Sequence, residues 1–146
     1  MDRRTEAREL AVQALYQMDV QGEDILRHLD SFFIESGADD MVRTLAGKWT
    51  RETWKEISDF DETIRSASIK WDINRLCAVD KSILRLSVYQ LQKCPEIPAK
   101  VVINEAIELA KKYSTAQSPG FVNGVLDSVM KKLNRDDETK NKEAAD

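Results

Sequence analysis

The sequence predicts an all-α protein in which seven helices pack into compact bundles. The chain of 146 residues contains only five glycines and three prolines, so few positions interrupt helical structure. Apolar residues recur at three- and four-residue steps along most of the chain, which is the period of a helix with one buried face. No long repeat is visible, which argues against a solenoid.

The first half of the chain carries four of the seven predicted helices. The first covers about residues 4–19 and stops at Gly22, and the second runs from Ile25 to about Gly37. The third covers about residues 42–57, and the fourth covers about residues 60–71 and is anchored by Trp71. The apolar stripe of the first helix consists of Ala7, Leu10, Ala11, Ala14, Leu15 and Met18.

The second half carries three more predicted helices. Between residues 76 and 91 apolar side chains cover more than one face, which is typical of a helix enclosed by its neighbours. Two prolines, Pro95 and Pro98, then interrupt the chain, and a sixth helix begins near Ala99. The pair Ser118-Pro119 resembles a helix N-cap followed by a favoured first residue, so it starts the seventh helix.

Composition indicates one folded domain, residues 1–134, followed by a disordered charged tail, residues 135–146. The chain is 42% hydrophobic and 33% charged, as expected of a soluble globular protein. The tail, RDDETKNKEAAD, has no large apolar residue to offset its ordering entropy. The N-terminus lacks the apolar core of a signal peptide and no stretch is long enough to span a bilayer, so we expect a cytoplasmic protein without a membrane partner.

Residues that carry chemistry are scarce, which argues against an enzyme. The single histidine, His28, has no neighbouring cysteine or paired acid, and we expect it on the surface. Cys77 and Cys94 lack metal-ligand spacing and are interpreted as buried free thiols. We therefore expect no metal and no cofactor. Because the net charge is -4, any contact with nucleic acid must come from a local basic patch.

Three segments resemble the NusB family. Residues 97–133, IPAKVVINEAIELAKKYSTAQSPGFVNGVLDSVMKKL, resemble its C-terminal signature, above all INEAIELAK and FVNGVLD. Residues 3–16, RRTEARELAVQALY, resemble its N-terminal helix, and residues 79–91, VDKSILRLSVYQL, resemble its central helix. The resemblance implies seven helices in two small packed helical bundles, with residues 1–134 as an RNA-binding domain.

The resemblance also implies a function and partners. NusB-like proteins act in transcription antitermination, particularly of ribosomal RNA operons. They pair with NusE, a ribosomal protein, and the pair binds the single-stranded boxA element of nascent RNA. Other Nus factors and RNA polymerase are then engaged indirectly.

By resemblance and charge, eight residues are predicted to bind RNA: Arg3, Arg4, Arg8, Lys111, Lys112, Gln117, Ser118 and Phe121. Guanidinium groups suit phosphate, the start of the last helix favours anions, and an exposed Phe121 ring suits stacking on an unpaired base. We expect the first and last helices to converge, so that these residues share one surface. Two alternatives remain open: a solvated helix start offset by Asp2, Glu6 and Glu9, and a Phe121 ring that packs under the first helix.

The polar side of the central helix is the predicted docking site for NusE. The residues are Asp80, Lys81 and Arg85, and ordinary surface pairing explains them nearly as well. Two other functions stay open. One is an RNA-positioning module related to the N-terminal domain of ribosomal RNA cytosine methyltransferases, and the other is a structural adaptor, either as a monomer or as a homodimer that uses the RNA face.

Overall fold

Helices form all the regular structure in the part of the chain that the computed structural model describes, residues 2–68 and 73–135. Within these residues there are eight α-helices and one short 3-10 helix, and the all-α prediction is confirmed. They are α1 (Arg3–Gln21), α2 (Asp24–Arg27), α3 (Leu29–Glu35), α4 (Asp40–Lys55), α5 (Ile57–Ala67), η1 (Ile73–Arg75), α6 (Ala78–Lys93), α7 (Ala99–Tyr113) and α8 (Ser118–Lys132).

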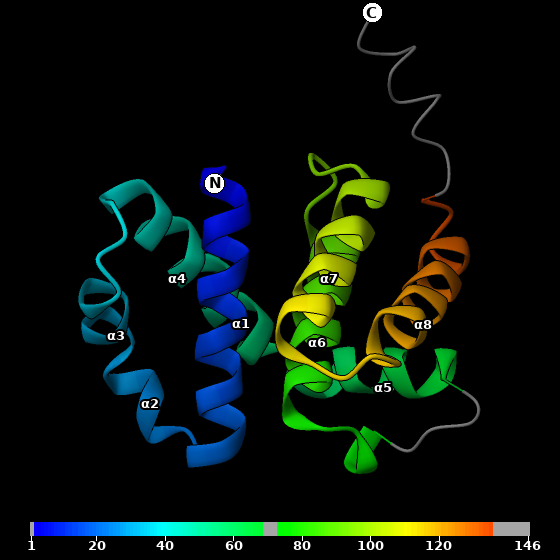
Figure 1. The fold of residues 1–146 in the computed structure, drawn as a ribbon, viewed down its shortest axis with the longest axis horizontal. Coiled ribbons are helices and arrows are strands. Elements are labelled where there is room, and N and C mark those ends of the chain that lie inside the picture. Colours follow the sequence, from blue (N-terminus) through cyan, green and yellow to red (C-terminus); the bar gives the residue numbers. More distant parts are fainter. Residues whose placement is uncertain (1, 69–72, 136–146) are drawn as a thin grey trace, which may run out of the picture.

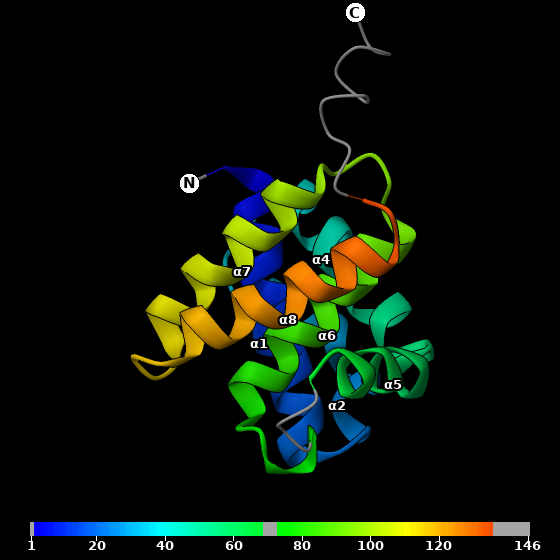
Figure 2. The same ribbon diagram turned by 90° about the vertical axis from the view of Figure 1, so that its right-hand side faces the viewer.

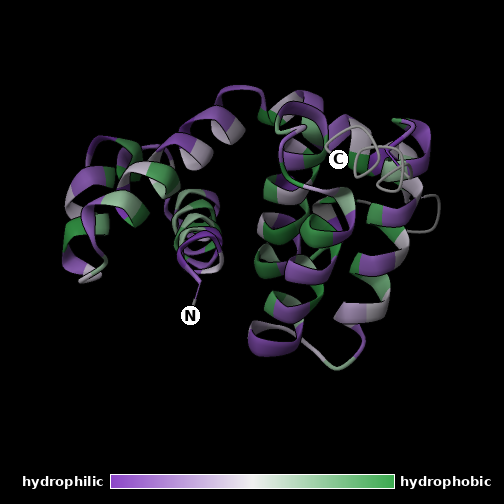
Figure 3. Ribbon diagram, turned by 90° about the horizontal axis from the view of Figure 1, so that it is seen from above, coloured by the Kyte–Doolittle hydropathy of each residue, from purple (hydrophilic) through white to green (hydrophobic). Residues whose placement is uncertain are grey.

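The helices form two bundles, as predicted. Helices α1 to α4 make the first and α5 to α8 make the second (Figure 1). Viewed from above, the two bundles lie side by side, and hydrophilic and hydrophobic residues alternate along the helices (Figure 3). Helix α6 contacts α1 and α4 in the first bundle and α5, α7 and α8 in the second. It is therefore the element that unites the molecule.

The number of helices differs from the prediction because one predicted helix is two. His28 adopts φ -108° and ψ 15°, outside the helical region, and separates α2 from α3. Its N–H donates to the carbonyl of Ile25, which closes the last turn of α2. The predicted stops at Gly22 and Gly37 are confirmed, since both glycines take a positive φ that other residues rarely adopt.

The predicted core is also confirmed. All six residues of the stripe on the first helix are buried, and α6 is enclosed from Ser82 to Leu91. Trp49 and Tyr89 are buried and Trp54 is half-buried, as expected of packing groups. Trp71 lies outside the described residues. No helix in the described ranges combines the length and the apolarity needed to cross a membrane.

Two details correct the sequence-based expectations. Cys94 is buried, but Cys77 is exposed because it lies just before α6, where the chain has not yet entered the core. Arg135, predicted to begin the disordered tail, instead donates to the carbonyl oxygens of Leu91 at 2.9 Å and Ile97 at 2.6 Å. This residue therefore caps the end of α6 and the loop that follows. The rest of the predicted tail, residues 136–146, lies outside the described residues.

Candidate nucleic-acid interface

The N-terminus of α1 presents two exposed arginines. Asp2 caps the helix by accepting from the N–H of Arg4 at 2.7 Å. The Nε of Arg3 lies 3.1 Å from Oδ2 of Asp39, and both side chains are at least half exposed. Arg4 makes no ion pair with any residue that the structure describes. Arg3 and Arg4 are thus open to a phosphate group from solvent.

Arg8, by contrast, is buried, which corrects its assignment to the RNA-contacting group. Only 2% of the residue is exposed. Its Nε donates to Oε1 of Gln90 at 3.2 Å, its Nη1 lies 3.5 Å from Glu105, and its guanidinium carbon lies 5.5 Å from the centroid of the Trp49 ring. Burial lowers the pKa of Arg8, and Glu105 opposes this effect. Arg8 joins α1 to α4, α6 and α7 and does not face solvent.

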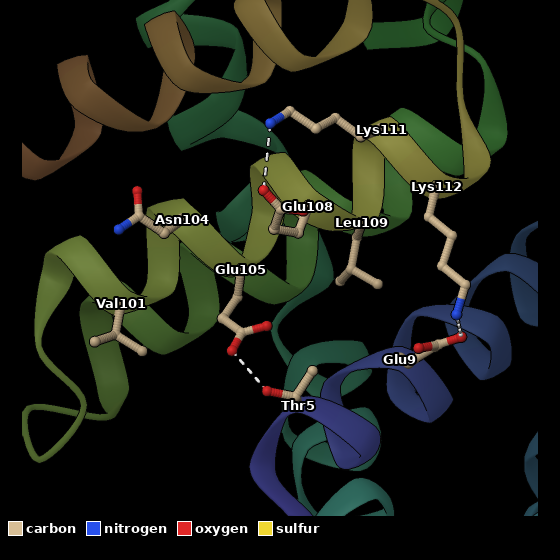
Figure 4. Close-up of a pocket in the computed structure, with 9 residues that line it drawn as sticks. All are labelled: Thr5, Glu9, Val101, Asn104, Glu105, Glu108, Leu109, Lys111 and Lys112. Atoms are coloured by element: carbon tan, nitrogen blue, oxygen red, sulfur yellow. Dashed lines mark hydrogen bonds and ion pairs between the residues drawn. The ribbon is translucent and has the colours of Figure 1, made fainter. Parts of the chain in front are cut away.

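A groove of about 740 Å³ separates α1 from α7 (Figure 4). Both predicted lysines lie on its wall, and both are paired. Lys112 Nζ lies 2.7 Å from Glu9 Oε1 on α1, and Lys111 Nζ lies 3.3 Å from Glu108 on its own helix. The groove is lined by Thr5, Glu9, Val101, Asn104, Glu105, Glu108, Leu109, Lys111 and Lys112.

The turn between α7 and α8 is held by Asp80, a residue predicted to dock NusE. The Ser118 hydroxyl donates to Oδ2 of Asp80 at 2.9 Å, and the Ser114 hydroxyl donates to Oδ1 at 2.7 Å. Ser118 is 3% exposed and Asp80 is 8% exposed. These residues fix the start of α8 internally, and their direct contact with RNA or NusE stays a prediction.

Phe121 and Gln117 lie beside this turn and line a second, smaller pocket. Gln117 is exposed, and Phe121 is half-buried and packs against the core beside the start of α6. The ring therefore does not lie under the first helix, and its stacking on an RNA base stays a prediction. The pocket has a volume of about 170 Å³ and also includes Arg75 and Cys77. Sequence reasoning did not assign these two residues to the site, because they lie outside the three segments that resemble the family and Cys77 was interpreted as a buried thiol.

The predicted NusE-docking residues of α6 are engaged within the molecule. Arg85 forms a two-point contact with Asp61 of α5, at 2.7 and 2.8 Å, and its Nη1 lies 2.9 Å from Asp19 of α1. Lys81 lies 3.3 Å from the same Asp19. Burial lowers the pKa of Arg85, but the bonds to Asp61 and Asp19 outweigh it and the pKa is raised. Arg85, which is 8% exposed, is therefore a bridge between the bundles and not an open docking group.

The candidate RNA residues form two groups, and the expectation that the first and last helices converge is wrong. Helix α6 lies between α1 and α8 along the long axis of the molecule (Figure 1), and the view along that axis has α8 in front (Figure 2). Arg3 lies at the start of α1. Ser118 lies near the other end of α1, because it is bonded to Asp80, and the next residue, Lys81, contacts Asp19. Sixteen positions separate Arg3 from Asp19, which is about 24 Å along a helix. The groove between α1 and α7 lies between the two groups.

Comparison with known proteins gives one consistent family. The model of the NusB family matches residues 5–131. Transcription antitermination protein NusB of Anaeromyxobacter dehalogenans strain 2CP-1 is 45% identical over 132 residues, which covers 90% of this chain and 92% of the relative.

Solved structures agree. A NusB structure from T. maritima has a TM-score of 0.78 and 34% identity, covering 90% of this chain and 92% of that one. A structure of antitermination factors NusB and NusE in complex with double-stranded RNA has a TM-score of 0.82 and 28% identity, covering 90% and 98%. The match of the family model along most of the chain, on the two-bundle fold described above, shows that this chain belongs to the NusB family.

Proposed function

We propose that this chain is a transcription antitermination factor that binds boxA-type RNA of nascent ribosomal RNA transcripts together with NusE. The observation that carries the proposal is the 45% identity, over 90% of the chain, to a relative named as a transcription antitermination protein. The likeness to a solved complex of NusB, NusE and RNA supports the two partners. Other Nus factors and RNA polymerase are engaged through that complex, in the cytoplasm.

The proposed RNA surface runs between the two groups of residues. Arg3 and Arg4 hold phosphates at one end, and the α7–α8 turn, with Lys111, Lys112, Gln117 and Phe121, holds the strand at the other. Arg8 and Ser118 support these ends from below, Arg8 by fixing α1 and Ser118 by fixing the start of α8. The role is binding without catalysis. Since the net charge is -4, binding by the chain alone is weak and NusE supplies the remaining contacts.

The test compares the affinity for a boxA-like single-stranded RNA with that for a scrambled strand, with and without NusE. We expect weak, salt-sensitive binding by the chain alone and a clear preference for the boxA-like strand once NusE is present. Equal affinity for both strands in the presence of NusE would contradict the proposal.

Replacing Arg4 with alanine tests the first end of the surface. Because Arg4 is exposed, its removal should leave stability within about 0.5 kcal/mol of the wild type. The slope of log affinity against log salt should fall in magnitude by about 0.7 for each phosphate that the variant no longer neutralises, measured by titration at several salt concentrations. Arg27, exposed on α2 beside Asp24, provides the matched control, and its alanine variant should keep the full slope. An unchanged salt slope for the Arg4 variant would show that Arg4 does not contact an RNA phosphate.

The other functions proposed from sequence lead to different measurements. The name and the near full-length coverage of the relatives favour antitermination over a methyltransferase module. Methyl transfer to RNA by the purified protein would favour an enzyme instead. A homodimer that uses the RNA face stays a prediction, and its test is the molecular mass across a range of concentrations, since a dimer would compete with RNA for the same surface.

A further inference from the structure

Lys112, a cation of the proposed RNA surface, is held by a carboxylate from the other bundle. Its Nζ lies 2.7 Å from Oε1 of Glu9, and the hydroxyl of Tyr113 donates to the same oxygen. The ammonium also lies 5.2 Å from the centroid of the Tyr113 ring. Gln13 donates to the Tyr113 hydroxyl at 3.4 Å, so the cluster ties α1 to the end of α7. Figure 4 shows Lys112 reaching across the groove to Glu9.

The two members of this ion pair differ in their access to solvent. The side chain of Glu9 is 15% exposed, whereas that of Lys112 is 52% exposed. Burial pushes the pKa of Glu9 upward, but the bonds from Lys112 and Tyr113 outweigh it and hold the pKa below its ordinary value. The bond to Glu9 is the main cause of a raised pKa for Lys112. Both groups are therefore charged at neutral pH.

A phosphate that binds Lys112 must either share the ammonium with Glu9 or separate the ion pair. In both cases the mostly buried carboxylate of Glu9 lies close to the incoming phosphate, and in the second case it also loses its cation, so binding at Lys112 alone is unfavourable. Glu105 and Glu108 line the same groove and add to the repulsion of a polyanion. A strand that is held only at this point therefore gains little from Lys112. A strand that is also anchored by Arg4 and Phe121 brings other interactions that offset the separation of the ion pair.

We propose that Glu9 is a specificity-determining residue, which keeps Lys112 from RNA strands that are not also anchored at the two ends of the surface. The inference rests on the proposed function, because it assumes that RNA crosses this groove. It goes beyond that function by assigning a role to an acidic residue. Glu9 weakens RNA binding, and it weakens the binding of strands that are not anchored at both ends the most.

The test is the Glu9→Gln variant, whose amide oxygen still accepts from Tyr113 but carries no charge. We expect the dissociation constant for a scrambled single strand to fall by about threefold to fivefold, the range of a partly exposed ion pair. The dissociation constant for the boxA-like strand with NusE should fall less, so that the preference between strands decreases. The Glu6→Gln variant is the matched control, because it removes the same charge from a half-buried position on α1.

A double-mutant cycle with Lys112→Met separates the effect of breaking the Glu9–Lys112 ion pair from the effect of removing one negative charge near the RNA. In the Lys112→Met background, Glu9→Gln should strengthen binding to the scrambled strand no more than Glu6→Gln does. If the gain persists without Lys112, or if Glu6→Gln gives the same gain in the wild-type background, the inference is wrong. The scrambled-strand measurements need neither NusE nor a boxA preference. If the effect of Glu9→Gln depends on Lys112 but the boxA-like strand is not preferred, the proposed function is contradicted. If the boxA-like strand is preferred but the effect of Glu9→Gln does not depend on Lys112, only the role of Glu9 is contradicted.

Discussion

Replacing Arg8 with methionine is expected to lower the free energy of unfolding by about 3 kcal/mol, the low end of the range for breaking a buried ion pair. The low end applies because Glu105, which would be left without its partner, is 23% exposed and keeps some hydration. Methionine preserves most of the packing volume but removes the donor to Gln90 and the cation over Trp49. Urea denaturation followed by circular dichroism measures the change.

Arg4→Met is the control, since it makes the same substitution one turn earlier on the exposed face of α1. Its stability should be close to that of the wild type. At temperatures where both variants are folded, the Arg8 variant should keep the salt dependence of RNA binding and the Arg4 variant should not. The opposite pattern, a stable Arg8→Met variant with a reduced salt slope, would return Arg8 to the RNA-contacting group.

Replacing Arg85 with methionine should destabilise the protein by about 3 to 5 kcal/mol, because Asp61 loses the Arg85 cation and Asp19 keeps only the Lys81 ammonium at 3.3 Å. Asp19 and Asp61 are 17% and 19% exposed in their side chains, so water compensates each of them poorly. Helices α1 and α5 would lose their link through α6. The shift of the urea midpoint reports the effect.

Lys81→Met provides the comparison, because Lys81 contacts only Asp19, at 3.3 Å, and Arg85 remains beside that carboxylate. It should cost about 1 kcal/mol or less. If Arg85→Met were as stable as Lys81→Met and lost only its affinity for NusE, Arg85 would be a docking residue after all.

The helices were predictable because their signals are local. The buried stripe from Ala7 to Met18 follows the helical period, and the prolines at 95 and 98 correctly place the start of α7 at Ala99. The break at His28 was not predictable in the same way. The apolar period continues across it, and only the backbone angles in the folded chain reveal the interruption.

The candidate site was less predictable, because it depends on contacts between distant segments. Arg8 lies at the flank of an apolar stripe, and its charge alone suggests exposure. Its partners Trp49, Gln90 and Glu105 come from three other helices and can be identified only from the fold. The pairing of Glu9 with Lys112 joins residues 103 positions apart and left no pattern in the sequence. Family resemblance pointed to particular segments but could not give the accessibility of each side chain.

Alkylation of Cys77 is the most direct test that RNA reaches the α7–α8 turn. Cys77 is exposed and lines the same small pocket as Phe121, whereas Cys94 is 3% exposed and serves as an internal control. The rate of alkylation is measured with NusE alone, and then with NusE and either a boxA-like or a scrambled strand. The boxA-like strand should slow alkylation of Cys77 well beyond the effect of NusE alone, and the scrambled strand should not. An unchanged rate at saturating boxA-like RNA would contradict an RNA surface that ends at Phe121.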